Sequence, residues 1–411
     1  MTAPGRLYST TTWAKGVLCA LILFGCTPGP QPPSDLHARF AEWFVTPRKQ
    51  LLDTLLHYRL NAEEWDSLIE SARPGSVKAG AFRKRLEDIA GRSYTLGYQT
   101  PDTIDPDTTY PLIVYLHGGT GTRRTDKGAE AYGMMRALAD TFSLFLASPS
   151  ANREAPWWSA GGLQRILQCL RYMSLHYPIN PDKVFLAGVS DGGTGCYVAA
   201  AMIPGPFAGF FAVSGFGGLA LRMGIPLHPE NLMQRPIYNV NAGKDRLYPA
   251  PAVKSFLDKL QRAGVTIHRS FHPDRRHGFA YRAEEMGTIA SLIRRWSRPG
   301  SRRGISWKFT AGFPASCDNV VSWRLSGSGS ASVSAYHRLD TLIVTTRGLK
   351  ELVVSRAGNR GNRPLRVRAN ETPVRTVSPL PTISRERFLM MQQRGIPEMF
   401  REQPLYRITL K

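Results

Sequence analysis

The feature that most constrains the fold of this chain is an alternation of short apolar runs with longer helical segments after residue 91. The runs typical of strands are SYTLGY, PLIVYLH, SLFLAS, KVFLAG, GFFAVSG, PIYNVNAG and TIHRSF. The intervening helices are expected at residues 129–140, 161–176, 192–202, 252–263 and 283–296. Strands that alternate with helices pair in parallel through right-handed crossovers. The sequence therefore predicts an α/β domain over residues 76–299, with a mostly parallel sheet flanked by helices.

Different patterns flank this region. Residues 36–75 have apolar side chains near helical spacing. They predict a helical segment that either covers an active site as a lid or packs on the main domain, and we favour packing. After the stretch SRPGSRRG, residues 300–411 contain short β-like runs separated by Gly, Asn and Ser. This pattern is typical of a small antiparallel β-sandwich, and we expect an accessory β domain without catalytic groups.

The N-terminus has the features of an export signal. Arg6 and Lys15 precede the apolar run GVLCALILFG, which is shorter than the roughly 20 residues that a membrane-spanning helix needs. A short apolar run after positive charges is typical of a secretory signal, which we predict over residues 1–25. Residues 26–35 are rich in proline and suit a stiff tether.

The apolar run ends in LFGC, which resembles the end of a bacterial lipoprotein signal. This resemblance implies that Cys26 carries lipid and becomes the new N-terminus. The protein would then be exported and anchored to a membrane of the cell envelope. The alternative is a signal cleaved elsewhere, with Cys26 incidental, which would give a secreted protein.

Positive charge is concentrated toward the C-terminus. The 411-residue chain has a formal net charge of +22, and residues 301–411 hold 19 Lys and Arg against 7 Asp and Glu, a net charge of +12. Such an excess fits either an anionic partner or a solvated basic surface. The arginines are scattered rather than packed into a run, so we favour the solvated surface and expect no nucleic-acid partner.

Neither the cysteines nor the short motifs indicate a metal or a cofactor. Cys169, Cys196 and Cys317 lack the spacing of a disulfide framework or a zinc site, and we expect buried free thiols. The chain also lacks H-E-x-x-H and a dinucleotide-binding glycine fingerprint. We therefore expect no cofactor and no metal.

A glycine-flanked serine lies between a predicted strand and a predicted helix. The stretch KVFLAGVSDGGTGCYVAA places Ser190 between Gly188 and Gly192. Alone, G-x-S-x-G also fits a flexible loop in a chain rich in glycine. Between a strand and a helix of small residues, it is typical of a sharp turn that exposes the serine Oγ at the carboxyl edge of a sheet. We therefore predict that Ser190 is a nucleophile.

A serine nucleophile needs a general base and a group that orients the base. His277 is the expected base because it lies in the loop after the strand TIHRSF, and His272 in the same loop is the alternative. Asp245 is the expected acid because it follows the strand PIYNVNAG. Asp274 is the alternative acid.

Two further loops are expected at the same edge of the sheet. The glycines after PLIVYLH predict an oxyanion hole made by the backbone N–H groups of Gly119 and Asp191, with a plain glycine turn as the alternative. The loop ANREAPWWSAGG contains Trp157 and Trp158. These tryptophans either wall a substrate pocket or fill the core under the loop, and we choose Trp158 as the substrate contact.

These motifs resemble those of the α/β-hydrolase superfamily. The order Ser190, Asp245, His277 is the order of its nucleophile, acid and base. The stretches YPLIVYLHGGTG, PINPDKVFLAGVSDGGTGCYVAA and HGF are similar to secreted esterases related to polyhydroxybutyrate depolymerases and feruloyl esterases, and to prolyl-oligopeptidase-type hydrolases. The resemblance covers about residues 93–296. It implies the α/β-hydrolase fold and serine-dependent acyl transfer through an acyl-enzyme, without a metal.

The leading hypothesis is therefore an exported, lipid-anchored carboxylesterase, whose ester substrate is open and includes carbohydrate-linked and polymer-linked esters. A serine peptidase is the alternative among enzymes. A non-catalytic surface binding lipoprotein, in which the C-terminal region does the work, is the alternative outside enzymes. The complete set of catalytic residue types argues against that last hypothesis.

Overall fold

The computed structural model describes residues 33–72, 78–105, 107–129, 132, 134–299, 304–327, 330–355, 363–395 and 404–410. The expected export signal and residues 26–32 of the expected tether, which include Cys26, lie outside the described residues, so they stay predictions. Within the described ranges, no helix combines the length and the apolar character that crossing a membrane requires.

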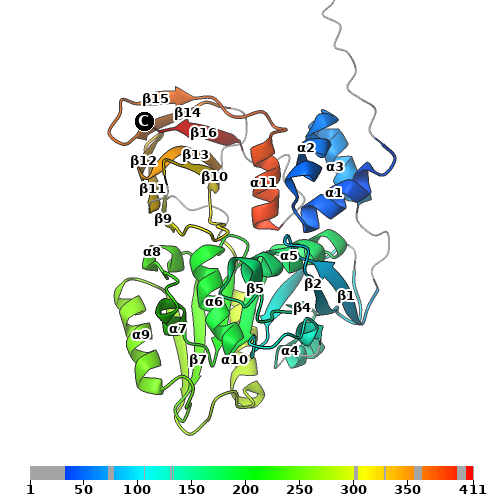
Figure 1. Cartoon of the computed structure of the whole chain (residues 1–411), viewed down its shortest axis with the longest axis vertical. Helices are drawn as coiled ribbons and strands as arrows, with labels where there is room; N and C mark the ends of the chain where they lie inside the picture. Colours follow the sequence, from blue (N-terminus) through cyan, green and yellow to red (C-terminus); the bar gives the residue numbers. More distant parts are fainter. Residues whose placement is uncertain are drawn as a thin grey trace, which may run out of the picture.

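The central region forms one eight-stranded sheet in the order β1-β2-β4-β3-β5-β6-β7-β8 (Figure 1). Neighbouring strands from β4 through β3 to β8 run parallel, whereas β2 pairs antiparallel with both β1 and β4. The strands are β1 (Ala81–Glu87), β2 (Ser93–Gln99), β3 (Tyr110–Leu116), β4 (Phe145–Pro149), β5 (Ile179–Val189), β6 (Gly209–Val213), β7 (Ile237–Ala242) and β8 (Ile267–His272). This arrangement confirms the expected mostly parallel sheet.

Helices cover both faces of this sheet. They are α4 (Met135–Thr141), α5 (Ala160–His176), α6 (Asp191–Met202), α7 (Gly217–Arg222), α8 (Pro229–Leu232), α9 (Ala250–Arg262) and α10 (Arg282–Arg295). Successive side chains of a strand point to opposite faces. In β3, Leu112 and Val114 join the core beneath α5, α6 and α9, whereas Ile113 and Tyr115 join the core beneath α4 and α10.

The edge strand β1 is not predicted by an apolar pattern. Its sequence AFRKRLE is dominated by charge, and its side chains are exposed or only half-buried. It owes its conformation to pairing with β2. Charged side chains on an edge strand also disfavour pairing with another chain.

The N-terminal helical segment packs on the main body beside α5 (Figure 1). It consists of α1 (Leu36–Val45), α2 (Lys49–His57) and α3 (Ala62–Ser71). Its aromatic side chains meet a helix near the C-terminus, α11 (Arg385–Arg394). The ring of Phe388 lies 5.3 Å from the ring of Trp43 and 5.0 Å from that of Trp65. The first and the last parts of the described chain therefore share one core.

The C-terminal region forms two sheets, β10-β13-β16 and β15-β14-β12-β11-β9, around a common apolar core. The strands are β9 (Gly304–Phe309), β10 (Val320–Leu325), β11 (Ala331–Arg338), β12 (Thr341–Arg347), β13 (Leu349–Ser355), β14 (Leu365–Ala369), β15 (Arg375–Val377) and β16 (Leu405–Thr409). The expectation of a wholly antiparallel sandwich is wrong in one place, because β12 and β14 run parallel. Between β12 and β14 the chain passes through the other sheet as β13. It then returns to the first sheet, where β14 runs in the same direction as β12.

This β region contacts the main domain at the amino edge of the central sheet. Arg235 holds both carboxylate oxygens of Asp318 at 2.7 Å, and the Ser316 N–H donates to the Met202 carbonyl at 3.0 Å. Met202 ends α6, whereas Ser190 immediately precedes it. The 12 residues of this helix separate the two by about 18 Å at 1.5 Å per residue. The β region therefore docks at the opposite end of α6 from Ser190.

Candidate active site

Ser190 lies in the sharp turn between β5 and α6. Its backbone has φ 57° and ψ −118°, a conformation that residues with a side chain rarely adopt. Two glycines make the turn possible. A Cβ on Gly192 would collide with the Leu116 carbonyl, and a Cβ on Gly188 would collide with the backbone of Gly192. Without side chains at these two glycines, α6 can begin close against the central sheet. The half-buried Ser190 therefore lies at the carboxyl edge of that sheet.

Ser190, His277 and Asp245 form one chain of hydrogen bonds. Ser190 Oγ lies 2.8 Å from His277 Nε2, and His277 Nδ1 lies 2.7 Å from Asp245 Oδ2. An ionised carboxylate only accepts hydrogen bonds, so this contact assigns the proton of the neutral imidazole to Nδ1. Nε2 then has a lone pair facing the serine hydroxyl. The three residues follow β5, β7 and β8, so they meet at the carboxyl edge of the sheet.

The loop after β7 holds the Asp245 carboxylate in place. Its Oδ1 accepts the backbone N–H groups of Leu247 at 2.8 Å and Tyr248 at 2.9 Å, which leaves Oδ2 to face His277. The Tyr248 ring also lies edge-on to the His277 ring, with centroids 5.2 Å apart. Sequence reasoning missed Tyr248. The available signal was its place three residues after an aspartate, where aspartate side chains often accept a backbone N–H.

The alternative base and acid are engaged elsewhere. His272 Nε2 lies 2.6 Å from a carboxylate oxygen of the buried Glu285. Asp274 pairs with Lys244 at 2.8 Å, and its side chain is 83% exposed. The structure thus brings Asp245 and His277 to Ser190 and leaves both alternatives in other contacts.

The predicted oxyanion loop, which follows β3, lies against Ser190. A Cβ on Gly118 would be 3.1 Å from the Cβ of Ser190. The Asp191 carboxylate ties the loop to the serine turn, because its Oδ2 accepts the Thr120 N–H at 2.7 Å and the Thr120 hydroxyl at 3.0 Å. Asp191 is also the first residue of α6, where a backbone N–H has no acceptor within the helix. Gly119 and Asp191 therefore lie on the two segments that meet at the serine.

The contacts of the Gly118 carbonyl orient the N–H of Gly119. Gly118 O lies 2.6 Å from Lys127 Nζ and 2.9 Å from His117 Nδ1. In a trans peptide the carbonyl and the following N–H point in opposite directions, so the Gly119 N–H points away from Lys127. Gly119 itself has φ 64°, which favours glycine. Sequence reasoning missed Lys127, and no local motif marks it.

His117 is a structural part of this loop. Its Nε2 accepts the Ala151 N–H at 3.1 Å, which assigns the ring proton to Nδ1, the donor to Gly118 O. Burial lowers the pKa of His117 to about 4, so the ring is neutral at neutral pH. The fully buried Trp157 donates its indole N–H to the His117 carbonyl at 2.8 Å.

The two tryptophans of the neighbouring loop have different surroundings. Trp157 fills the core beneath the loop, in contact with α6, where a Cβ on Gly195 would lie 2.5 Å from its own Cβ. Trp158 is half-buried and packs against the same core. A substrate contact at Trp158 stays a prediction.

The part of the chain that the structure describes contains no group of three or more His, Cys, Asp or Glu side chains that could hold a metal ion. Cys169, Cys196 and Cys317 are buried free thiols, as expected. Burial raises the pKa of each thiol, so the reactive thiolate form is disfavoured at all three.

Residues 157–298 match the model of the dienelactone hydrolase family. The matched segment contains Ser190, Asp245 and His277 and ends before the C-terminal β region. No curated protein matches the chain.

Several solved structures are similar to part of the chain. A thermostable esterase has 18% identity and a TM-score of 0.42 over 53% of this chain and 63% of that one. Acylaminoacyl peptidase from Pyrococcus horikoshii has 14% identity and a TM-score of 0.44 over 55% and 43% of the two chains. S-formylglutathione hydrolase from Staphylococcus aureus has 17% identity and a TM-score of 0.42 over 53% and 100%. The chain spans less than two thirds of the first two proteins. The order and direction of its strands, with the serine turn between β5 and α6, show that it has an α/β-hydrolase fold with a β-rich region added at the C-terminus.

Proposed function

We propose that this protein is a serine hydrolase that cleaves carboxylic esters. The observation that carries the proposal is the hydrogen-bond chain from Ser190 Oγ through His277 to Asp245, with distances of 2.8 and 2.7 Å. A serine hydroxyl needs such a base to become a nucleophile at neutral pH. The match of residues 157–298 to the dienelactone hydrolase family supports an ester as substrate, because a lactone is a cyclic carboxylic ester.

In the proposed acylation step, Ser190 Oγ attacks the carbonyl carbon of the ester while its proton passes to His277 Nε2. Asp245 stabilises the resulting imidazolium and keeps it oriented. The carbonyl oxygen becomes an oxyanion, which accepts hydrogen bonds from the N–H groups of Gly119 and Asp191. When the tetrahedral intermediate collapses, the bond to the alcohol oxygen breaks and His277 returns its proton to the leaving alcohol.

In the proposed deacylation step, a water molecule takes the place of the alcohol. His277 accepts one proton from the water as the water oxygen attacks the acyl carbon. Collapse of the second intermediate breaks the bond to Ser190 Oγ, and His277 returns the proton to the serine. The products are a free carboxylic acid and an alcohol, with the enzyme unchanged.

Labelling with a fluorophosphonate probe tests this proposal. The wild-type protein should be labelled on Ser190, and Ser190→Ala should not be labelled. Ser190→Ala should also lose about a million-fold in turnover of a 4-nitrophenyl ester. A 4-nitroanilide with the same acyl group distinguishes an esterase from a peptidase, because only the scissile bond differs. Activity of the Ser190→Ala protein near that of the wild type would refute the proposal.

We also propose that the protein is exported and carries lipid on Cys26. The short apolar run ending in LFGC, followed by a proline-rich stretch, supports this proposal. Mass spectrometry of the mature N-terminus should find a lipid-modified cysteine, and Cys26→Ser should lose that modification. An unmodified N-terminus at another residue would contradict lipid attachment.

A further inference from the structure

The hairpin that joins β11 to β12 has a leucine at its tip. Arg338 pairs with Thr341 across the hairpin, so the turn consists of Leu339 and Asp340. Leu339 is 96% exposed and has φ 54°. The first residue of such a turn favours glycine, because a bulky side chain is strained at positive φ. Neither burial nor backbone conformation accounts for a leucine here, which indicates a contact outside the chain.

An aromatic side chain and three cations lie behind this turn on one face of the sheet. Residues directly opposite each other on paired strands point to the same face. Tyr336 of β11 is opposite Ile343 of β12, which is opposite Arg368 of β14. Arg338 and Arg366 lie in the next row, nearer the turn. Tyr336 is 49% exposed, and the three arginines are exposed as well. We call these three arginines the arginine face.

The arginine face is on the outer side of the five-stranded sheet. The side chains that alternate with it, among them Ala335, Leu342 and Val367, belong to the apolar core between the two sheets. In Figure 1, β11 and β12 lie on the side of the β region that faces away from α11 and the N-terminal helices. The tip and the arginine face are therefore presented to the outside of the molecule.

The charge of this outer side matches an anionic lipid surface. Strands β11, β12 and β14 contain four arginines and neither Asp nor Glu. The carboxylate in the turn, that of Asp340, lies 2.6 Å from Arg366, and exposed ion pairs of this kind are weak. Cations around an apolar side chain suit a membrane, where the cations meet phosphate headgroups and the apolar group reaches the acyl chains. Tyrosine is enriched at the same interface.

We propose that the β11–β12 tip and the arginine face bind an anionic phospholipid membrane. Leu339 enters at the level of the acyl chains, Tyr336 lies among the headgroups, and the arginine face contacts the phosphates. A soluble acidic polymer would engage the arginines but leave Leu339 in water, so the strained leucine favours a membrane. For these arginines the proposal replaces the solvated surface expected from the sequence. It depends neither on the proposed enzymatic function nor on lipid at Cys26.

Co-sedimentation with lipid vesicles tests the proposal. The full-length chain is used with Ser190→Ala, so that no lipid ester is cleaved during the measurement. It should bind mixed vesicles, of phosphatidylcholine and phosphatidylglycerol in equal amounts, at least about ten times more tightly than vesicles of phosphatidylcholine alone. Salt at about 1 M should largely remove this preference, because the Debye length falls to about 3 Å. Equal affinity for the two kinds of vesicle would overturn the proposal.

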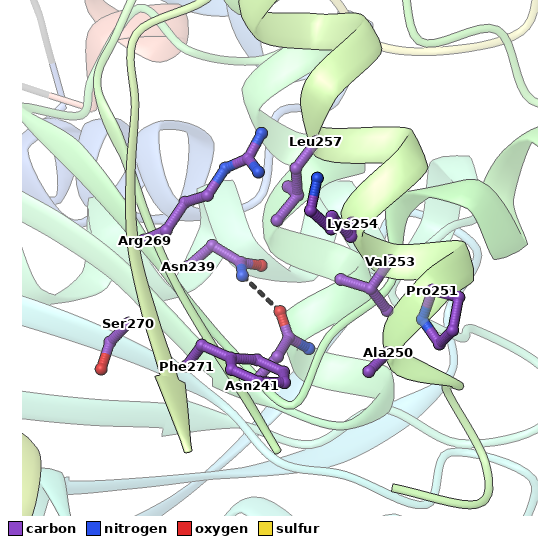
Figure 2. Close-up of a pocket in the computed structure, with 10 residues that line it drawn as sticks. All are labelled: Asn239, Asn241, Ala250, Pro251, Val253, Lys254, Leu257, Arg269, Ser270 and Phe271. Atoms are coloured by element: carbon purple, nitrogen blue, oxygen red, sulfur yellow. Dashed lines mark hydrogen bonds between the residues drawn. The ribbon is translucent and has the colours of Figure 1, made fainter. Parts of the chain in front are cut away.

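Two double variants of this protein locate the charge contribution, because they share the same N-terminal residues. Arg366→Gln with Arg368→Gln should weaken binding to mixed vesicles at least about tenfold, since each arginine at an anionic surface contributes about fivefold in affinity. The control removes two exposed positive charges from α9 of the main domain, at Lys254 (Figure 2) and Arg262, each changed to Gln. Each double variant contains one ion-paired residue, Arg366 or Lys254. Equal losses in the two would show that only net charge matters and refute the proposal.

A third variant distinguishes a membrane from a soluble polyanion. Leu339→Gly removes the side chain at the tip and relieves the positive φ, so its melting temperature should be at least that of the parent. Its binding to mixed vesicles should fall at least about fivefold, whereas its binding to soluble polyphosphate should match that of the parent. Val374→Gly removes a 45% exposed apolar side chain from the loop after β14, at the opposite end of that strand from the tip, and should change neither. Unaltered vesicle binding of the Leu339→Gly protein would mean that the tip does not enter the membrane, contrary to the proposal.

Discussion

The ammonium group of Lys127 lies 2.6 Å from the carbonyl oxygen of Gly118, the residue that packs directly against Ser190. A second contact joins the same Nζ to the Gly119 carbonyl at 3.1 Å. Both carbonyls are therefore turned toward Lys127, and the N–H groups that follow them are turned away. The Thr120 N–H meets the Asp191 carboxylate, and the Gly119 N–H is left for the proposed oxyanion.

Lys127→Met should lower kcat for a 4-nitrophenyl ester about ten- to a hundredfold while KM changes little. The N–H of Gly119 would lose its orientation, and this N–H stabilises charge that develops only in the transition state. Lys183→Met is the matched control, because Lys183 also donates to carbonyl oxygens, those of Arg294 and Trp296, both at 2.7 Å. It should leave kcat near that of the wild type. An equal loss of kcat in both variants would show that Lys127 only stabilises the folded protein and does not orient the Gly119 N–H.

Asp245→Asn should lower kcat about ten-thousandfold, because an amide no longer fixes the imidazole tautomer. Asp274→Asn, which changes an exposed carboxylate in the neighbouring loop, should retain nearly full activity. Steady-state kinetics of the two variants compares the two aspartates directly. A larger loss in Asp274→Asn than in Asp245→Asn would mean that the acid has been assigned to the wrong loop.

His117 should make the stability of the protein depend on pH. Burial lowers its folded-state pKa from 6.5 to about 4, so between these values the unfolded state binds more protons than the folded state. Stability contributed by neutral His117 is then fully present above pH 6.5 and falls as the pH drops toward 4. The loss amounts to about 3 kcal/mol of unfolding free energy.

Urea unfolding of the wild type and of His117→Gln at several pH values measures this contribution. The free-energy difference between the two proteins should shrink by about 3 kcal/mol from pH 6.5 to pH 4. His37→Gln, at an exposed position, should leave the pH dependence of the wild type unaltered. A constant difference between the wild type and His117→Gln over this range would be inconsistent with a neutral buried imidazole.

Asp318→Ala should destabilise the protein by about 3–5 kcal/mol, because it leaves the guanidinium of Arg235 buried without a counter-charge. The catalytic constant for a small ester should stay near the wild-type value in folded protein, since this contact is at the far end of α6. Asp340→Ala removes an exposed ion pair with Arg366 in the same β region and should cost less than about 1 kcal/mol. Urea denaturation gives both values. Similar stability losses in the two variants would show that the Arg235–Asp318 contact is not a buried anchor.

The features that could be predicted from the sequence are those that depend on residues close together along the chain. A glycine-flanked serine between an apolar strand and a helix of small residues gives one local geometry, because only glycine permits the tight turn and the close start of α6. The alternation of strands and helices likewise predicts the parallel sheet, because the apolar faces of each element can be buried only in such layers.

Other features depend on which distant residues meet. The structure places His272 at the end of β8 and His277 in the loop that follows, and the two could not be ranked by geometry until their partners, Glu285 and Asp245, were placed beside them. Lys127 follows the two glycines by only eight or nine residues, in the same connection between β3 and α4, but no motif marks it, and its role depends on how that connection folds back on itself. The packing of Phe388 against Trp43 joins residues more than three hundred positions apart. Local patterns record how a segment buries its own apolar face, whereas such long-range contacts depend on the relative positions of whole elements, which form only when the chain folds.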